Sequence, residues 1–461
     1  MSTADFLRIV YTGHEIDGTG KLTFTGYIPE GVPREFQVAC RFVMKPYGQD
    51  PRINLWSAEL SRFRGRIPEG DATFILYGID ESVVVAEGHC YPRSGFPVDR
   101  ETEIPSLYQL ICRSVHFPRP ATVNDDAIAQ FDWRQWVIPL YNVDFIGSPR
   151  RDEEGKPLIF DGTPWATTVE WRGWKLEFVR EHDRDKYASG DVPLTGYLSI
   201  LTSPEVDHST VRSAVDELFE LISPVSGVTQ VPTLVLDASH YDMYWTPLQR
   251  PVVQRRAHFQ FLDRRVNNFE PYLDAILPFY ESLPSGPQRQ ALRALARSLV
   301  VPPVPIESAI MAISSGFEIL REHFWPGERY LFSEKSGSQL RAKLKEFGTT
   351  LPTEHQAEFI RLVPGKAREV RRRPLAAVLP EIGRHFLGTK CGTPPSLAQL
   401  VAYRNELVHG GFMEVSLEAY AVVDKTSGML NDAFTGLIGL LPWTRPEVRG
   451  LTRPPAQPES D

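Results

Sequence analysis

The chain has 461 residues, a formal net charge of −8, 42% hydrophobic residues and 23% charged residues. This length predicts more than one domain, and the near-average composition excludes a disordered chain or a disulfide scaffold. Because the whole molecule is acidic, contact with a nucleic acid must come from a local basic patch.

The four cysteines are too scattered to form a recognisable metal or disulfide motif. They are Cys40, Cys90, Cys112 and Cys391, and no CxxC pair is present, so a reducing cytoplasm fits best. The first residues lack a signal-peptide pattern, and no segment approaches the ~18 apolar residues that a bilayer span needs. We therefore expect a cytoplasmic protein without membrane contact.

Residues 1–235 read as a β-rich region. Short alternating or β-branched runs such as KLTFTGYI, REFQVACRFVM and TTVEWRGWKLEFV are separated by Gly, Pro and Asp, which predicts an antiparallel β-sandwich or two abutting sheets. Five tryptophans crowd one span of this region: Trp133, Trp136, Trp165, Trp171 and Trp174. They indicate packing on sheet faces, with a stacking platform for bases or sugars as the alternative.

Helices become dominant toward the C-terminus. A helix is predicted at 208–222 and a strand at PTLVLDA, and after about residue 265 every pattern is helical. This switch marks a boundary, so we expect a helical connector over 236–300 and an all-α bundle over 301–443. The fold class is therefore α+β multidomain, with a Pro-rich disordered tail over 444–461.

The bundle should open with the clearest amphipathic helix of the chain, over 305–324. Pro305 stands at its start, and its apolar stripe is formed by Ile306, Ile310, Ile313, Phe317 and Leu320. Further helices are predicted at about 336–347, 353–363, 372–386, 396–409 and 416–440.

A basic run lies within this bundle, over 361–390. It holds eight basic and two acidic side chains, a net charge of +6 in an acidic protein. The residues we expect to contact RNA are Lys366, Arg368, Arg371, Arg372 and Arg373. The alternative is a solvated helix rim, which is the usual role of such charges.

The motif that carries chemistry is SLAQLVAYRNELVHGG, residues 396–411. Arg404 falls on the apolar stripe of Leu397, Leu400, Val401 and Val408, where it needs a carboxylate, a subunit interface or a bound anion. Gly410 and Gly411 should stop the helix, so His409 lies in the last turn, where the helix dipole favours an imidazolium. Asn405, four residues earlier, should hydrogen-bond a ring nitrogen of His409.

These residues resemble the HEPN superfamily, whose signature is an Arg, commonly followed by a polar residue such as Asn, and a His after four to six intervening residues at a helix end. The segment RNELVH fits it, and the resemblance covers about 300–442. It implies a helical bundle, usually dimeric, with Arg404, Asn405 and His409 as catalytic residues of an endoribonuclease that uses neither a metal nor a cofactor. A β-rich region before such a bundle is similar to ApeA-type antiviral proteins of abortive infection.

The chemistry implied is attack of the RNA 2′-hydroxyl on its own phosphate, with His409 moving protons and Arg404 stabilising charge. Because one chain offers a single such His, we expect a homodimer whose partner supplies a second imidazole. The β-rich region would then be a sensor or regulator that responds to a viral or stress signal.

Several alternatives stay open. A second Arg–His pair, Arg8 and His14, has the spacing but no helical context. In the alternative of a monomer, Glu318 or Glu307 on the first bundle helix neutralises Arg404. The residue two positions after His409 is Gly411, whereas some HEPN toxins silenced by modification have a Tyr there, so that mode of control is not expected.

Two rival functions also remain. One is a non-catalytic binding or dimerisation protein with a degenerate bundle, in which function resides in the β-rich half. The other is a glycan-binding or glycan-active protein, suggested by the tryptophans and by Asp125, Asp126 and Asp132, although no carboxylate pair at fixed geometry is recognisable.

Overall fold

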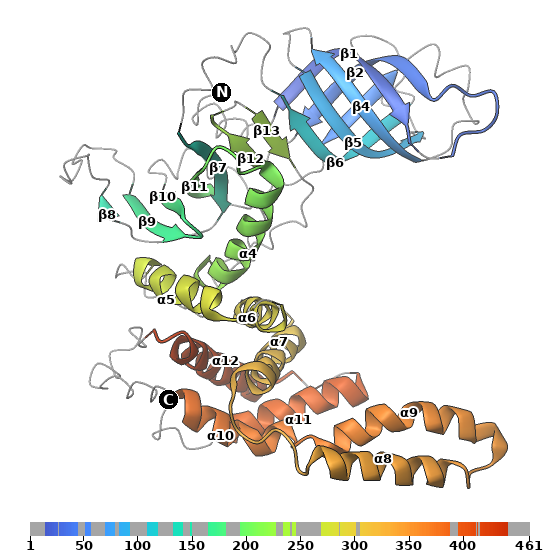
Figure 1. The fold of residues 1–461 in the computed structure, drawn as a ribbon, viewed down its shortest axis with the longest axis vertical. Coiled ribbons are helices and arrows are strands. Elements are labelled where there is room, and N and C mark those ends of the chain that lie inside the picture. The colour runs from blue at the N-terminus through green and yellow to red at the C-terminus, as the bar shows by residue number, and fades with distance from the viewer. Residues whose placement is uncertain are drawn as a thin grey trace. The chain divides into compact units, whose positions relative to one another are not determined.

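The chain forms an antiparallel β-rich region followed by an all-helical region, as the sequence predicts (Figure 1). The computed structural model describes residues 14–25, 27–44, 51–56, 70–78, 83–92, 108–118, 132–141, 148–149, 165–180, 194–226, 234–239, 242–245, 269–284, 286–300, 305–387, 395–411, 413 and 415–440. Two compact units are present: 1–253 with 262–274, and 254–261 with 275–461. Arg8, Asp125, Asp126, Cys391 and the predicted tail over 444–461 lie outside the described residues.

The first unit begins with a closed antiparallel barrel of six strands. They are β1 (His14–Phe24), β2 (Glu35–Met44), β3 (Arg52–Trp56), β4 (Gly70–Gly78), β5 (Val83–Pro92) and β6 (Tyr108–Phe117). Strand β3 closes the ring because it pairs with two partners: Ile53 lies opposite Phe42 of β2 and also opposite Leu110 of β6. The expected sandwich is therefore a barrel at this end of the chain, since the β3–β6 pairing joins residues too distant in sequence to be read from local patterns.

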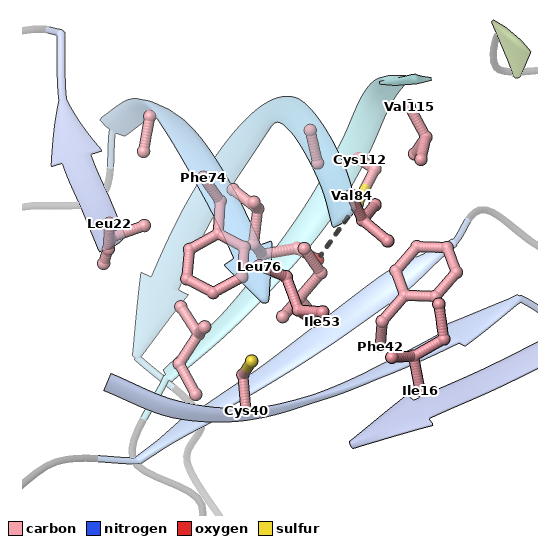
Figure 2. Close-up of a cluster of buried hydrophobic side chains, with 14 of the residues drawn as sticks. Ile16, Leu22, Cys40, Phe42, Ile53, Phe74, Leu76, Val84, Cys112 and Val115 are labelled. Atoms are coloured by element: carbon pink, nitrogen blue, oxygen red, sulfur yellow. Dashed lines mark hydrogen bonds between the residues drawn. The ribbon is translucent and has the colours of Figure 1, made fainter. Parts of the chain in front are cut away.

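Alternating side chains of these strands fill the barrel with apolar groups (Figure 2). Phe42, Ile53, Phe74 and Leu76 are fully buried there. Burial raises the pKa of the Cys40 thiol to about 12, with a smaller contribution from Asp17, and Cys90 is raised to about 12 by burial. These thiols are therefore core groups, and the reactive thiolate form is disfavoured.

A second run of strands continues from the C-terminal end of β6, where β13 pairs with Val115–Phe117. The strand order is β6-β13-β12-β7-β11-β10-β9-β8. Their bounds are β7 (Arg134–Tyr141), β8 (Ser148–Pro149), β9 (Trp165–Trp171), β10 (Trp174–Arg180), β11 (Leu194–Thr202), β12 (Leu234–Asp237) and β13 (Asp242–Trp245). Helix α4 (His208–Ser226) contains the predicted helix 208–222 and extends it by one turn. Trp136 and Trp171 are buried, which confirms packing rather than a stacking platform for these two.

A column of rings joins β6, β13, α4 and β7. The Tyr244 ring stacks on His116 at 4.5 Å and on His208 at 3.9 Å between centroids. Trp136 lies 6.3 Å from His208, and the Arg134 guanidinium covers the Trp136 ring at 4.4 Å. Because these residues come from four elements, the column fixes the start of α4 against the sheet.

His208 is held neutral in this column. Burial lowers the pKa of His208 from 6.5 to about 4, and the charges of Arg212, His116 and Arg134 act in the same direction while Asp207 opposes them. His208 is also the first residue of α4, where the positive end of the helix dipole disfavours a second positive charge. Protonation of this ring is therefore disfavoured in the folded chain near neutral pH.

We predict that His208 makes the β-rich unit sensitive to acid. Because the unfolded chain takes up this proton near pH 6.5 and the folded chain only near pH 4, the stabilisation is complete above pH 6.5 and lost as the pH falls toward 4. The loss should be about 2 kcal/mol, less than the full shift would give because water reaches part of the ring. The His208→Phe variant keeps the ring stacking but cannot take up a proton. Its urea midpoint should therefore change less between pH 7 and pH 4 than that of the wild type. His355→Phe, an exposed control, should follow the wild type, and a His208→Phe profile as steep as the wild type would contradict the assignment.

The second unit is built from helices, and α5 spans the boundary between the units. They are α5 (Phe269–Ser282), α6 (Pro287–Ser298), α7 (Ile306–Ile319), the π-helix η2 (Leu320–Phe324), α8 (Glu334–Gly348), α9 (Thr353–Arg371), α10 (Leu375–Leu387), α11 (Pro395–Gly410) and α12 (Leu417–Leu437). All five residues of the predicted 305–324 stripe are buried. Helix α7 packs against α6, α11 and α12, while α8 and α9 pack on each other as a hairpin (Figure 1).

Two helix boundaries around the basic run differ from the prediction, and α12 ends at Leu437 rather than at 440. Helix α9 continues through Pro364 to Arg371, eight residues past the expected end at 363, although proline removes a backbone donor. The next helix begins at Leu375 rather than 372, because Arg372 is extended, with ψ of 138°, and pairs as an isolated bridge with Tyr330. None of the helices in the described ranges is long and apolar enough to cross a membrane.

Candidate functional site at the end of α11

Helix α11 places the Arg–His motif at an exposed helix end. Its bounds, Pro395–Gly410, match the predicted 396–409 within one residue. Leu397 and Leu400 are buried and anchor its first half. Gly411 has φ of 77° and its amide donates to Leu407 at 3.1 Å, which is the helix stop that the glycines predicted. His409 therefore lies in the last turn, as expected.

The second half of α11 extends past its neighbour α12. Gln399 Nε2 donates to Glu418 Oε1 at 2.6 Å, so the first turn of α12 lies beside the first half of α11. Val408 is 51% exposed, so its predicted place on a buried stripe is wrong. Arg404 is half-buried and His409 is exposed, because the packed part of the helix ends before them.

The three predicted catalytic residues lie in the second half of α11, but Asn405 makes a different contact from the one expected. Arg404 Nη1 donates to Asn405 Oδ1 at 3.5 Å, so Asn405 touches Arg404 rather than the His409 ring. His409 lies five positions after Arg404, about 7.5 Å further along the helix axis and about 140° around it.

Glu318, the carboxylate considered as a partner for Arg404, forms an ion pair with a different arginine. Glu318 pairs with Arg321, a side chain that is only 5% exposed and that also pairs with Glu322 at 2.9 Å. Burial makes Arg321 the stronger competitor for Glu318, because an unpaired guanidinium in the protein interior is costly. Within the described part of the chain, no carboxylate forms an ion pair with Arg404.

The three consecutive arginines of the basic run are mainly structural. Arg371 donates to the Phe332 carbonyl at 3.1 Å and lies 4.2 Å from the Tyr330 ring centroid. Arg372 pairs with Glu322 at 2.8 Å. These contacts tie the end of α9 to η2 and to the segment that follows it, so the contacts of the two side chains indicate a structural role.

Arg373 is bound in the same way. It forms a two-pronged pair with Glu381, at 2.6 and 3.1 Å, and donates to the Glu328 carbonyl at 3.1 Å. The hydrogen bond from Arg373 is the main cause that lowers the pKa of the Glu381 carboxyl. By contrast, Arg361 and Arg368 are exposed on α9. Lys390, the last basic residue of the run, lies outside the described ranges.

We predict that replacing Arg371, Arg372 and Arg373 together with Ala weakens the fold. Each loses contacts to backbone or carboxylate groups, and Glu381 loses its guanidinium partner, so Tm should fall by roughly 5 °C in a thermal melt. The matched control is Arg361→Ala with Arg368→Ala, which removes exposed charges from α9 and should leave Tm within about 1 °C. A triple variant that melts with the wild type would show that these contacts are dispensable.

Two oppositely charged side chains, Lys366 and Glu369, form an exposed ion pair near the end of α9. Lys366 Nζ lies 2.7 Å from Glu369 Oε2, and both side chains are about two-thirds exposed. The hydrogen bond and the charge of Lys366 lower the pKa of the Glu369 carboxyl, and the charge of His409 contributes in the same direction. Glu369 therefore lies within electrostatic reach of His409. We call Lys366, Glu369, Arg404, Asn405 and His409 together the α9–α11 site.

Glu369 is the member of this site that the sequence reading did not select. It was counted only as an acidic residue within the basic run. The signal that could have found it is the continuation of α9 beyond Pro364, because the predicted helix ended at 363 and left Glu369 without a structural place. Among the described residues, no group of three or more His, Cys, Asp or Glu side chains is placed to hold a metal ion.

Comparisons of this chain with protein-family models, with curated proteins and with solved structures found no match.

Proposed function

We propose that the helical region is a metal-independent endoribonuclease of the HEPN type, with Arg404 and His409 acting directly on RNA. The observation that supports this most strongly is their joint position at the exposed end of α11, where a polymer can reach them. Arg404 has Asn405 as a weak partner rather than a carboxylate, so its guanidinium can take a phosphate.

The reaction is cleavage by the substrate's own 2′-hydroxyl. The hydroxyl oxygen attacks the adjacent phosphorus, and the planar fork of Arg404 stabilises the charge that develops on the phosphate oxygens. His409 exchanges protons with the reacting oxygens, since imidazole is the side chain suited to that task near neutral pH. The products are a cyclic phosphate and a free 5′-hydroxyl, and DNA is inert because it lacks the attacking group.

Exposed basic side chains of α9 position the RNA. Lys366 and Arg368 are both exposed, and Lys366 belongs to the α9–α11 site. Contacts of this kind hold the phosphate backbone without reading sequence, which suits a nuclease that acts on tRNA or on other RNA. Arg371, Arg372 and Arg373 contribute indirectly, by holding the end of α9 in place.

The β-rich region acts as a sensor or regulator in antiviral defence, keeping the nuclease inactive until a viral or stress signal binds. This part of the proposal rests on the order of the two regions and on the need to restrain a toxic ribonuclease.

The active form is a homodimer. Val408, Val415, Leu417 and Tyr420 are 50% exposed or more, and they lie at the end of α11, in the connection to α12 and at the start of α12. Exposed apolar side chains gathered along one stretch of chain favour burial in an interface. A two-fold dimer that covers them would bring two copies of α11 together.

The experiment that tests the function uses the full-length chain and a labelled single-stranded RNA in excess EDTA. Cleavage should persist, should leave 2′,3′-cyclic phosphate ends, and should be absent on DNA of the same sequence. Light scattering on the cleaving species should give the mass of two chains. Loss of cleavage in EDTA would contradict the metal-independent reaction, and intact RNA would favour a non-catalytic binding protein with a degenerate bundle.

A further inference from the structure

The α8–α9 hairpin forms an arm of the helical region. Its two helices, Glu334–Gly348 and Thr353–Arg371, pack on each other and share no comparable packing with the other described helices (Figure 1). The base of the arm is fixed, because the Leu331 amide donates to the Arg371 carbonyl at 2.8 Å and Arg372 pairs with a carboxylate of η2. Most side chains beyond this base are exposed, so the sides of the arm are open to a partner.

Two contacts within the arm show how its helices are aligned. The Phe347 ring packs against Phe359 in an edge arrangement, with 5.8 Å between the centroids. Toward the base, Gly337 lies so close to Arg371 that an added Cβ would come within 3.1 Å of the Arg371 Cδ. The helices therefore run antiparallel between these contacts, which determines the residues that lie level with one another.

Five basic side chains form one band around the middle of the arm. The antiparallel alignment puts residues 341–345 of α8 level with about 362–366 of α9. Neither 341–345 nor 362–368 contains an acidic residue. All basic side chains of these two segments are exposed. We call them the basic band: Arg341, Lys343, Lys345, Lys366 and Arg368.

Carboxylates return at both edges of the basic band. Glu346 follows it directly on α8, and Glu369 follows it on α9. Arg361 lies outside the band, one turn after Glu358 and about level with Glu346, so acidic side chains accompany its charge. The concentration of positive charge is therefore local to the middle of the arm, in a chain whose formal net charge is −8.

Contacts within the chain leave most of this charge available to a ligand. Lys366 pairs with a carboxylate at 2.7 Å, whereas Lys343, Lys345 and Arg368 form no ion pair with any residue that the structure describes. Arg341 and Lys345 are four residues apart, a like-charge spacing that destabilises a helix. The basic band therefore does not stabilise the free arm, and a bound polyanion would neutralise its repulsion.

We propose that the basic band binds the phosphate backbone of single-stranded RNA. This inference rests on the proposed function, because it names the class of RNA that the nuclease takes as substrate. Side chains two positions apart in a helix point about 200° apart, so Lys343 faces away from Lys345, and Lys366 from Arg368. A rigid duplex approaches from one side and reaches only part of such a band, whereas a flexible strand can follow it around the arm.

An aromatic ring beside the basic band favours the same class of RNA. Phe347 lies one turn after Lys343 and is 53% exposed, although it contacts Phe359. An unpaired base can stack on an exposed ring, whereas a base within a duplex is already stacked on its neighbours. Phosphates on the basic side chains and a base on Phe347 would hold one strand at several points.

The test measures binding of a labelled RNA without self-complementarity to the full-length His409→Ala chain, by fluorescence anisotropy over a range of salt. With five phosphate contacts, the slope of log affinity against log salt should be about −3.5. Adding Lys343→Ala and Lys345→Ala should make the slope shallower by about 1.4 and weaken binding about ten-fold or more. The matched control adds Lys335→Ala and Arg361→Ala, which remove two exposed charges of the arm outside the band and should leave the slope unchanged.

A duplex of the same sequence tests the preference for a single strand. It should bind more weakly and with a shallower slope. Phe347→Leu keeps an apolar side chain against Phe359 and should weaken binding of the single strand about five-fold, with no effect on the duplex. An unchanged slope after loss of Lys343 and Lys345, or a duplex bound as tightly as the single strand, would overturn the inference.

Cleavage separates this inference from the proposed function. In a chain that keeps His409, Lys343→Ala with Lys345→Ala should raise KM and leave kcat little changed, because these contacts hold the substrate and its transition state alike. A wild-type KM and salt slope in this active variant would overturn the role of the basic band while the nuclease stands. Binding that depends on the basic band, without cleavage by the wild-type chain, would support the RNA-binding surface and contradict the nuclease.

Discussion

His409→Ala should abolish RNA cleavage by the full-length chain, with a fall of at least about 10³-fold in kcat and a normally folded protein. The ring is exposed in the last turn of α11, so its removal leaves no cavity. The loss falls on kcat because the imidazole acts on a proton that moves only in the transition state. Cleavage is followed on a labelled RNA, and folding by circular dichroism.

Arg404→Ala should be equally damaging, and Arg404→Lys should recover little. A lysine keeps the charge but has no planar fork to hold two phosphate oxygens at once. His355→Ala and Arg361→Ala are matched controls, since both side chains are exposed on α9 outside the α9–α11 site. Near-wild-type cleavage by either site variant would remove the assignment of Arg404 and His409 as catalytic residues.

In the β-rich unit, Asp237→Ala should lower the free energy of unfolding by about 3–5 kcal/mol. Asp237 is fully buried at the end of β12, and its carboxylate accepts from Arg134 Nε at 2.7 Å. Arg134 also donates to the Val206 carbonyl at 3.0 Å and covers Trp136. Truncation at 237 leaves a guanidinium that is only 15% exposed without its counter-charge, which costs more than the ion pair itself contributes.

Urea denaturation followed by tryptophan fluorescence measures this loss. Asp237→Asn keeps an oxygen acceptor and should lose less than Asp237→Ala, because only the charge is removed. Asp216→Ala is the control: Asp216 pairs with Arg212 within α4 but is 48% exposed, so its loss should cost under about 0.5 kcal/mol. Equal effects at positions 237 and 216 would show that burial of the pair does not matter.

Local patterns in the sequence were enough to predict the elements that carry the candidate site. The stripe that begins at Ile306 predicts α7, and the run from Ser396 to Gly411 predicts α11 with His409 in its last turn. Both predictions succeed because helical periodicity and a left-handed glycine depend on neighbouring residues alone. The order of a β-rich region before a helical one is determined in the same way, by periods of two and then of 3.6 residues.

Only the tertiary structure decided which residues meet. The barrel closes through Ile53 and Leu110, Glu318 pairs with Arg321 instead of Arg404, and Val408 is exposed where the stripe predicted burial. The pairing of Ile53 with Leu110 and the exposure of Val408 are not encoded in a local window, because they depend on distant strands and on where a neighbouring helix begins. Glu318 and Arg321 are only three residues apart, but the burial of Arg321 decides that they pair. The basic run shows this most clearly. The three consecutive arginines are the same residue type as the exposed Arg368, yet their contacts stabilise the fold.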